Sequence, residues 1–133
     1  MEFPSFAFLN LIAQTIYDKK GFNILVIDLR GVSTLADYFV IAEGNIDRHI
    51  AAIADELLDV LKKEGEEVVF TEGLRGVGSG WIVLDYLHTI IHLFTPELRG
   101  KYALEEVWKD GKIVDTVIDI KTHLVEMTRE NPY

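Results

Sequence analysis

The 133-residue sequence contains no cysteine, and this absence removes several kinds of chemistry at once. Without thiols the chain can form no disulfide, bind no metal through thiolates and use no cysteine nucleophile. It also lacks any apolar run near the roughly 20 residues that cross a bilayer. Its N-terminus carries Glu2 where a signal peptide would carry Lys or Arg. These absences predict a soluble, cytoplasmic protein that does not enter a membrane.

Basic residues are also scarce, because 13 Lys and Arg stand against 22 Asp and Glu, which gives a formal net charge of −9. Nucleic-acid affinity comes largely from Lys and Arg side chains that displace counterions from phosphates. The pairs Lys19-Lys20 and Lys62-Lys63 are isolated and do not offset the acidic balance. We therefore expect little direct contact with nucleic acid, and a basic protein is the better electrostatic partner.

The chain has the length of one common domain, and its hydrophobic pattern switches between helical and strand periods. Apolar residues at helical spacing predict helices from Ser5 to Lys20, between Asn45 and Gly65, and from Pro96 through Trp108. Aliphatic runs predict these five strands: Phe22–Leu29, Tyr38–Ala42, Glu67–Thr71, Trp81–Leu84 and Thr89–Phe94. The fold class is therefore α/β, a single domain with a mixed, about five-stranded sheet flanked by helices.

Three local features add detail to this prediction. The run from Phe22 to Leu29 is nearly continuous, as in a strand that is buried on both faces. Asn45 is a candidate cap for the second helix, Asp47 suits its first turn, and Gly65 suits its end. The segment from Ile113 to Ile120 alternates only weakly.

The glycine-rich segment 72–80, EGLRGVGSG, invites comparison with phosphate-binding loops. A Walker A loop needs a lysine to meet the phosphate, and this segment has none. A dinucleotide-binding loop opens a helix, whereas this segment leads into the strand sequence Trp-Ile-Val-Leu. A flexible connection between strands is the better interpretation, and no cofactor is implied.

His88 and His92 have the H-x-x-x-H spacing of zinc proteases but lack the glutamate that follows the first histidine. The β-branched residues between them favour a strand, in which four residues span roughly 13 Å. Two ligands of one zinc ion must each lie about 2 Å from it. No metal site is therefore predicted here.

A third possibility is nucleotidyl transfer, in which Gly-Ser precedes two strand carboxylates that hold Mg²⁺. Here Asp85 follows Gly78-Ser79, but position 87 is a leucine, so the second carboxylate is missing. The alternative to a binding protein is a nucleotidyltransferase-like, nucleotide-binding enzyme that uses Asp85 with Ser79 and a remote Asp37 or Glu72. The missing carboxylate favours a protein without catalytic activity.

Trp81 and Asp85 lie four residues apart on one predicted strand and therefore on the same face. A lone tryptophan most often fills a core, and that interpretation stays open. The glycine-rich loop before Trp81 would leave one side of the indole uncovered, which favours a protein contact.

Three segments together resemble the ribosomal silencing factor family, also called Iojap-like proteins. They are DLRGVSTLADYFVIAEGNIDRHIAAIADEL, WIVLDYLHTIIHLF and RGKYALEEVW, and the match covers roughly residues 5–108. The positions that match the family pattern are Asp28, Ser33, Asp37, Gly44, Arg48, His49, Glu72, Gly73, Trp81, Asp85, His92, Tyr102, Leu104, Glu105 and Trp108. The resemblance implies a nucleotidyltransferase-like fold without the active site, in agreement with Leu87.

The resemblance also implies a factor, not an enzyme, that docks on the large ribosomal subunit. Family members bind the basic ribosomal protein L-fourteen, block subunit joining and so repress translation when nutrients are scarce. Organelle relatives assist large-subunit maturation, and members commonly form homodimers.

The resemblance leads to expectations for individual residues. We expect Trp81 to be an apolar anchor and Asp85 to pair with Arg or Lys of the ribosomal protein, with Glu72 and His92 beside them. A functional role and a structural role are equally expected for four further residues: Ser33, Asp37, Arg48 and His49. Tyr102 and Trp108 fit core positions of the last helix.

The sequence departs from the family pattern in two places. It reads EGNID before the Arg-His pair, where Glu43 and Asp47 would make the loop more acidic and bring its partner contacts into question. Residues 109–133 form a C-terminal extension of unassigned role, so that residues 1–108 are the expected silencing-factor domain.

Overall fold

The computed structural model describes residues 6–74, 79–102, 110–116 and 118 of the chain, without the Tyr102 side chain. Its helices and strands, in chain order, are α1 (Phe6–Asp18), β1 (Phe22–Asp28), β2 (Tyr38–Glu43), α2 (Asp47–Lys63), β3 (Phe70–Glu72), β4 (Trp81–Asp85), β5 (Thr89–Phe94), α3 (Pro96–Tyr102) and β6 (Lys112–Ile113). The strands form one sheet in the order β3-β4-β5-β2-β1-β6. β2 and β5 are parallel and the other neighbours are antiparallel, which confirms the predicted mixed α/β sheet.

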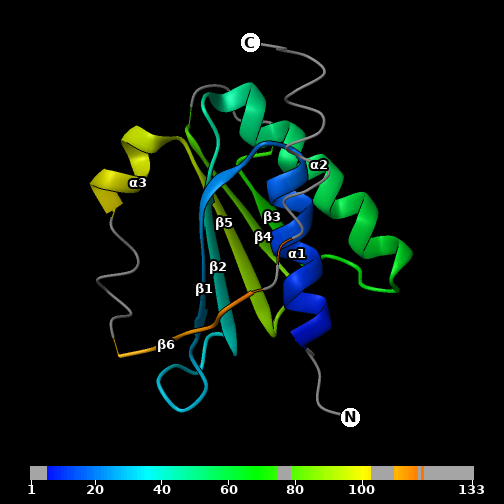
Figure 1. The fold of residues 1–133 in the computed structure, drawn as a ribbon, viewed down its shortest axis with the longest axis vertical. Coiled ribbons are helices and arrows are strands. Elements are labelled where there is room, and N and C mark those ends of the chain that lie inside the picture. The colour runs from blue at the N-terminus through cyan, green and yellow to red at the C-terminus, as the bar shows by residue number, and fades with distance from the viewer. Residues whose placement is uncertain (1–5, 75–78, 103–109, 117, 119–133) are drawn as a thin grey trace.

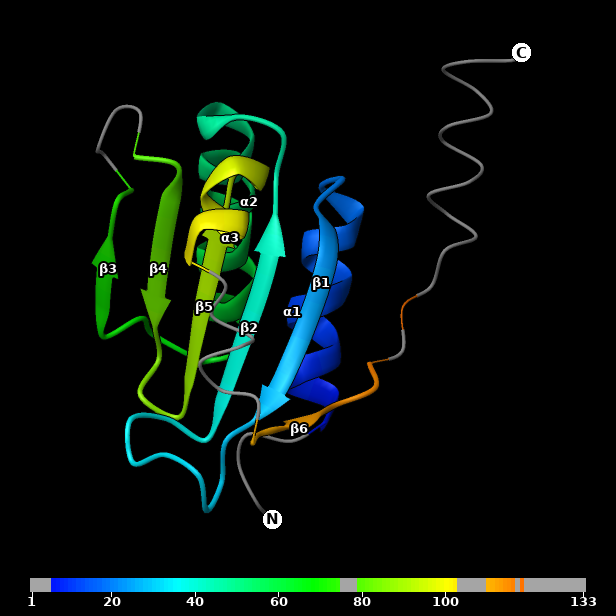
Figure 2. The same cartoon turned by 90° about the vertical axis from the view of Figure 1, so that its left-hand side faces the viewer.

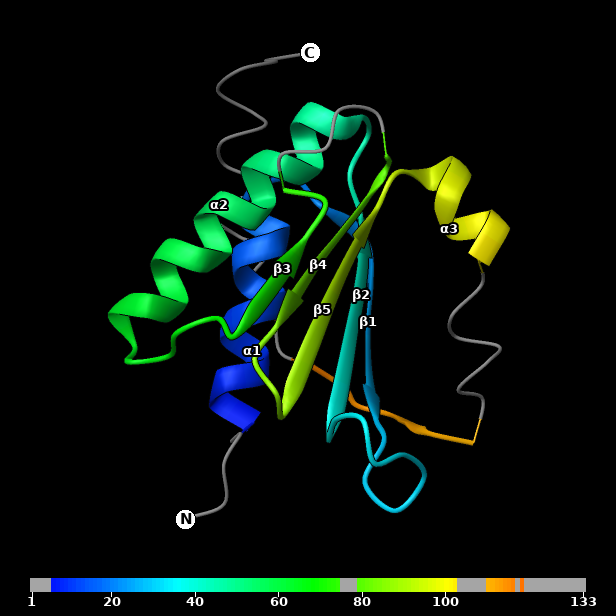
Figure 3. The same ribbon diagram turned by 180° about the vertical axis from the view of Figure 1, so that it is seen from behind.

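The helices lie on both faces of the sheet. α1 and α2 cover one face, and α3 lies against one end of the other face (Figures 1 and 2). Figure 3 shows the sheet from behind, with α1 and α2 on one side of it and α3 on the other. The helical spacing explains this arrangement, because Ile50, Ile53, Ala54, Leu57 and Leu61 fall on one side of α2 and are all buried.

A large core fills the space between these two helices and the sheet. Burial of each large aliphatic side chain there contributes about 1.5–3 kcal/mol. The sheet contributes Val26, Tyr38, Val40, Ala42, Ile82, Leu84, Ile91 and Leu93 to this core, and the turn after β4 contributes Tyr86. A smaller core lies on the opposite face, beneath α3 and the loop between β1 and β2, and consists of Ile27, Leu29, Ala36, Phe39, Ile41 and Phe94.

The sheet does contain a strand that is buried on both faces, but this strand is β2 and not the predicted β1. All six residues of β2 are buried, whereas β1 is fully buried only at Val26 and Ile27. The reason is position, because β2 lies between β1 and β5 at the centre of the sheet. β3 is also shorter than predicted and shifted toward the glycine-rich segment, since it spans Phe70–Glu72.

The predicted cap of α2 is wrong, whereas its predicted end is confirmed. The N-cap is Ile46, whose apolar side chain makes no cap bond. Asn45 lies one residue before it, and its backbone N–H donates to Nδ1 of His49, 2.9 Å away. At the other end Gly65 adopts a φ of +87° and its N–H bonds to the carbonyl of Lys62. Glycine tolerates this left-handed backbone, which ends the helix.

The C-terminal part of the chain contributes a sixth strand, one more than the predicted five. β6 pairs with β1 through Ile27 opposite Ile113, and the N–H of Val114 then bonds to the carbonyl of Val26. Gly111 permits the approach, since a Cβ there would lie 3.0 Å from the carbonyl oxygen of Asp28. Part of the predicted extension therefore joins the sheet, while its role and the boundary at residue 108 stay predictions. The second half of the predicted last helix, with Leu104, Val107 and Trp108, lies outside the described residues.

Candidate functional site

β4 carries the candidate anchor on the sheet face that α1 and α2 do not cover. Along this strand Trp81, Val83 and Asp85 are half-buried, and they alternate with buried Ile82 and Leu84. The predicted common face of Trp81 and Asp85 is therefore confirmed. Among the described residues α3 is the only helix on this open face, and it covers one end (Figure 2).

The indole of Trp81 is held by two residues of β5. Phe94 is its cross-strand partner, and the two rings stack with their centroids 4.9 Å apart. The indole Nε1–H donates a hydrogen bond to Nδ1 of His92 at 3.2 Å. Trp81 therefore has a fixed orientation in which its only polar atom is already used within the chain.

His92 is neutral and its tautomer follows from this bond. Because Nδ1 accepts from Trp81, the ring proton lies on Nε2, which is buried and has no hydrogen-bond partner among the described residues. Only 7% of the residue is exposed, and burial lowers the pKa of His92 from 6.5 to about 4. His92 thus supports Trp81 from beneath the surface, and its expected place beside a partner stays a prediction.

We expect the buried imidazole to make the fold sensitive to acid. An unfolded chain protonates His92 near pH 6.5, and the folded chain only near pH 4. The free energy of unfolding therefore has its full His92 contribution above pH 6.5 and loses about 3 kcal/mol of it as the pH falls to about 4. Urea unfolding at several pH values, compared with His92→Gln, measures this contribution. Glutamine can accept the Trp81 bond but does not titrate, so parallel pH curves for the two proteins would contradict the expectation.

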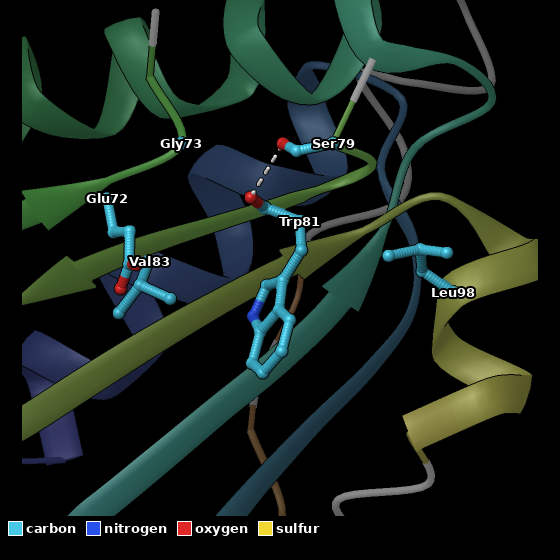
Figure 4. Close-up of a pocket in the computed structure, with 6 residues that line it drawn as sticks. All are labelled: Glu72, Gly73, Ser79, Trp81, Val83 and Leu98. Atoms are coloured by element: carbon cyan, nitrogen blue, oxygen red, sulfur yellow. Dashed lines mark hydrogen bonds between the residues drawn. The ribbon is translucent and has the colours of Figure 1, made fainter. Parts of the chain in front are cut away.

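A cavity of about 420 Å³ opens beside the indole (Figure 4). At its wall the backbones of Gly73 and Trp81 approach closely, because Gly73 has a φ of +82° and a Cβ there would clash with the carbonyl oxygen of Trp81. The lining combines apolar surface with one exposed carboxylate, and consists of Glu72, Gly73, Ser79, Trp81, Val83 and Leu98. Such a lining suits a long basic side chain, whose alkyl part would contact the apolar residues and whose charge would meet Glu72.

Asp85, Ser33 and Asp37 lie at the other end of the sheet from this cavity. Four residues of strand place Asp85 roughly 13 Å from Trp81. Asp85 Oδ1 accepts a bond from the N–H of Leu87 at 2.8 Å, and the N–H of Asp37 donates to the carbonyl of His88 at 2.9 Å. The hydroxyl oxygen of Ser33 accepts from the N–H of Leu35. The side chains of Ser33 and Asp85 therefore each bond within their own turn, whereas the backbone of Asp37 joins the β1–β2 loop to the turn at His88.

Arg48 and His49 belong to a third location, the first turn of α2. Nδ1 of His49 accepts from Asn45, while Nε2 lies 2.7 Å from the carbonyl oxygen of Lys19. His49 thus joins the end of α1 to the start of α2, whereas Arg48 is exposed. Trp81, His92 and Glu72 are brought together, and the other five candidates are distributed over two further places.

The predicted acidity of the EGNID loop is not borne out at its two carboxylates. Glu43 is only 6% exposed, and its Oε2 accepts bonds from Arg99 at 3.2 Å and from Asn23 at 3.0 Å. Asp47 Oδ1 accepts from the N–H of Gly80 at 2.7 Å. Both carboxylates stabilise the fold, because Glu43 holds α3 on the sheet and Asp47 ties α2 to the start of β4.

Sequence reasoning missed Glu43 and Arg99 as a pair, since 56 residues separate them. The sequence did contain one indication of a partner for Glu43. This residue directly follows the aliphatic residues of β2, and a charged side chain that is buried there needs a partner.

The residues of the alternative enzyme are not assembled by the fold. Ser79 lies beside Trp81 at one end of β4, and Asp85 lies at the other end. Glu72 faces Val83 in the sheet register, and Asp37 lies next to His88. Over residues 6–74, 79–102 and 110–116, no three His, Asp or Glu side chains gather as metal ligands. In that same part of the chain, no helix has the length and apolarity to cross a membrane.

Known structures share this fold. A crystal structure of a Bacillus halodurans protein matches with a TM-score of 0.72 and 29% identity, over 84% of this chain and 99% of the other. A Chromobacterium violaceum protein matches with a TM-score of 0.74 and 24% identity, over 91% and 97% of the two chains. The arrangement of helices around the sheet is therefore one that has been observed in crystals.

Sequence comparisons supply the family. The family model described as "Ribosomal silencing factor during starvation" matches residues 4–132. The ribosomal silencing factor of Bacillus subtilis is 35% identical over 80% of this chain and 89% of its own length, and that of Zymomonas mobilis is 40% identical over 77% and 76%. A mouse protein named "Mitochondrial assembly of ribosomal large subunit protein 1" is 29% identical over 75% of this chain and 44% of its own length. Because the model and both bacterial relatives span most of the sequence, the chain belongs to the ribosomal silencing factor family.

Proposed function

We propose that the chain docks through the open face of its sheet on the large ribosomal subunit and sterically blocks subunit joining, which represses translation. Its contact on the subunit is the basic ribosomal protein L-fourteen, and it acts in the cytoplasm without cofactor or catalysis. The observation that carries this proposal is the fixed indole of Trp81 beside a cavity with Glu72 at its edge.

The chemistry of the cavity supports a basic protein partner. The Trp81 Nε1–H is already bonded to His92, so the indole offers only its apolar ring to a partner. A lysine or arginine side chain could stack its alkyl part or guanidinium on this ring and pair with Glu72. A buried aromatic residue at the centre of an interface is the usual source of binding energy.

Charge and size support the same partner. The net charge of −9 would speed the encounter with a basic ribosomal protein and would repel ribosomal RNA. A standard interface covers about 800 Å² on each partner, which one face of a domain of this size can supply. Steric exclusion needs an occupied surface and no reaction, in line with a family name that describes silencing.

Sedimentation with purified subunits tests this function. We expect the chain to co-sediment with large but not small subunits, and binding to weaken as salt is raised. Large subunits that carry the chain should fail to form whole ribosomes when small subunits and Mg²⁺ are added. Normal joining by saturated large subunits would contradict the proposal.

A role in large-subunit assembly is a second candidate, favoured by the name of the mouse relative. The same docking surface would serve either role. Depletion of the chain separates them, since loss of assembly help leaves immature large subunits during growth, whereas loss of silencing leaves mature subunits that keep translating in starvation. We also propose that the chain forms a homodimer, which light scattering of the purified chain, with and without L-fourteen, tests.

A further inference from the structure

A second exposed apolar surface lies at the end of the sheet opposite α3. Four large side chains there are more than half exposed, whereas most others of their kind are buried: Leu35 64%, Val69 59%, Phe70 56% and Leu87 64%. We call these four side chains the end strip. Single exposed apolar residues are common on protein surfaces, but a contiguous group marks an interaction site.

Backbone hydrogen bonds bring together the chain segments that carry the end strip. The N–H of Val69 bonds to the carbonyl of Asp85 at 2.8 Å, and Phe70 faces Asp85 in the register. Leu87 forms the turn that follows Asp85. On its other side, the loop of Leu35 is joined to this turn by the bond from Asp37 to His88.

The loop between β1 and β2 places the end strip beside the open face. In Figure 2 this loop passes beneath the turn between β4 and β5, and in Figure 1 it projects to the same side of the sheet as α3. The open face therefore lies between α3 at the Trp81 end and the end strip at the Asp85 end. The two ends of β4 are roughly 13 Å apart, which is within one standard interface.

Carboxylates surround the end strip. Asp85 pairs with Phe70 in the sheet register, Asp37 follows Leu35 by two residues, and the exposed Glu67 precedes Val69 by two. Oε1 of Glu66 lies 3.5 Å from Nε2 of His88, in the turn between β4 and β5. The neighbouring cation Arg30 is already held by both oxygens of Asp28, at 2.8–3.2 Å. The apolar side chains therefore lie in a negative field.

We propose that the end strip is a second docking contact, which takes a basic, amphipathic protein segment of the large ribosomal subunit. The negative field selects this occupant. Ribosomal RNA and anionic lipid would be repelled by the carboxylates, and a second copy of the chain would bring the same carboxylates against each other. A lysine- and arginine-rich segment with apolar residues satisfies both the apolar strip and its acidic surroundings.

This inference rests on the proposed function, because the segment belongs to the particle on which Trp81 docks. Two contacts on one particle act as linked sites, so each raises the effective concentration of the other. The end strip would thereby hold the chain in one orientation on the subunit, which a single tryptophan anchor does not fix.

The test removes apolar surface from the end strip without disturbing the fold. In the double variant Leu35→Ser with Leu87→Asn, both positions are exposed, and asparagine tolerates the φ of +70° at position 87. The matched control is Phe6→Ser with Ile46→Ser, which removes two side chains that are 64% and 60% exposed elsewhere. Binding to purified large subunits is measured by sedimentation, and oligomeric state by light scattering.

We expect the end-strip variant to bind large subunits at least tenfold more weakly and the control to stay within twofold of the unchanged chain. Glu67→Gln should weaken binding several-fold at low salt and not at high salt. Unchanged binding by the end-strip variant, with Trp81→Ala still weakened, would overturn this inference alone. A change from dimer to monomer with unchanged subunit binding would show a self-contact and overturn it too. If the unchanged chain does not bind large subunits, both this inference and the proposed function fail.

Discussion

Replacing Trp81 with alanine should weaken binding to large ribosomal subunits by about 30-fold or more, the effect of losing a hot-spot residue of at least about 2 kcal/mol. The side chain borders the cavity and is held by Phe94 and His92, so a partner meets a preformed surface. Preorganisation of this kind avoids the entropy cost of ordering the indole on binding. Sedimentation with subunits at increasing protein concentration measures the loss.

Two further variants make this result specific. Trp81→Phe keeps an aromatic ring and should retain most of the affinity, although it leaves Nδ1 of His92 without its donor. Adding Asp85→Asn to Trp81→Ala should abolish pull-down of large subunits, since asparagine keeps the oxygen that accepts from Leu87 but removes the charge. Circular dichroism should be unchanged in all of them. Retained binding by the double variant would show that another face docks.

Replacing Arg99 with methionine should destabilise the fold by about 3–5 kcal/mol, because it leaves a charged group buried without its partner. The Glu43 side chain is 8% exposed and that of Arg99 13% exposed, at an Nη1–Oε2 distance of 3.2 Å. Arg99 Nη1 also donates to the carbonyl of Asn23 at 2.6 Å, so the variant loses a second bond. The loss is a large part of a typical domain's 5–15 kcal/mol, and urea unfolding measures it.

The matched double variant separates charge from packing. Glu43→Gln with Arg99→Met contains no unpaired carboxylate, so it should recover a large part of the lost stability. Because α3 supplies Leu98 to the cavity beside Trp81, Arg99→Met should also weaken subunit binding at temperatures where the fold is intact. A double variant as unstable as the single one would contradict the role of the buried charge.

Patterns within one element were predictable from the sequence, and contacts between distant elements were not. β4 and β5 follow directly from their aliphatic runs and from the β-branched residues between His88 and His92. The place of Trp81 and Asp85 on one face needed only the two-residue period of a strand. The absence of a carboxylate at position 87 could also be read from the sequence alone. In the structure Leu87 lies in a turn, with a φ of +70°.

The errors have a common physical origin in tertiary contacts. Asn45 is a good cap residue by type, but His49 binds its backbone while bridging to the carbonyl of Lys19. Glu43 and Asp47 were assigned to the surface because their partners, Arg99 and Gly80, lie far along the chain. The pairing of β6 with β1 joins residues more than 80 positions apart. Nothing in the local sequence of either strand indicates which strand it pairs with.

The order of the strands also constrains how the chain folds during its synthesis. β1 and β2 are neighbours in sequence, as are β4 and β5, so each pair can close early through short loops. The two pairs meet only through β2 and β5, where Tyr38 aligns with Thr89 and Glu43 with Phe94. During synthesis the halves of the sheet can therefore join only after Phe94 has left the exit tunnel, and the edge of β2 must stay unpaired until then.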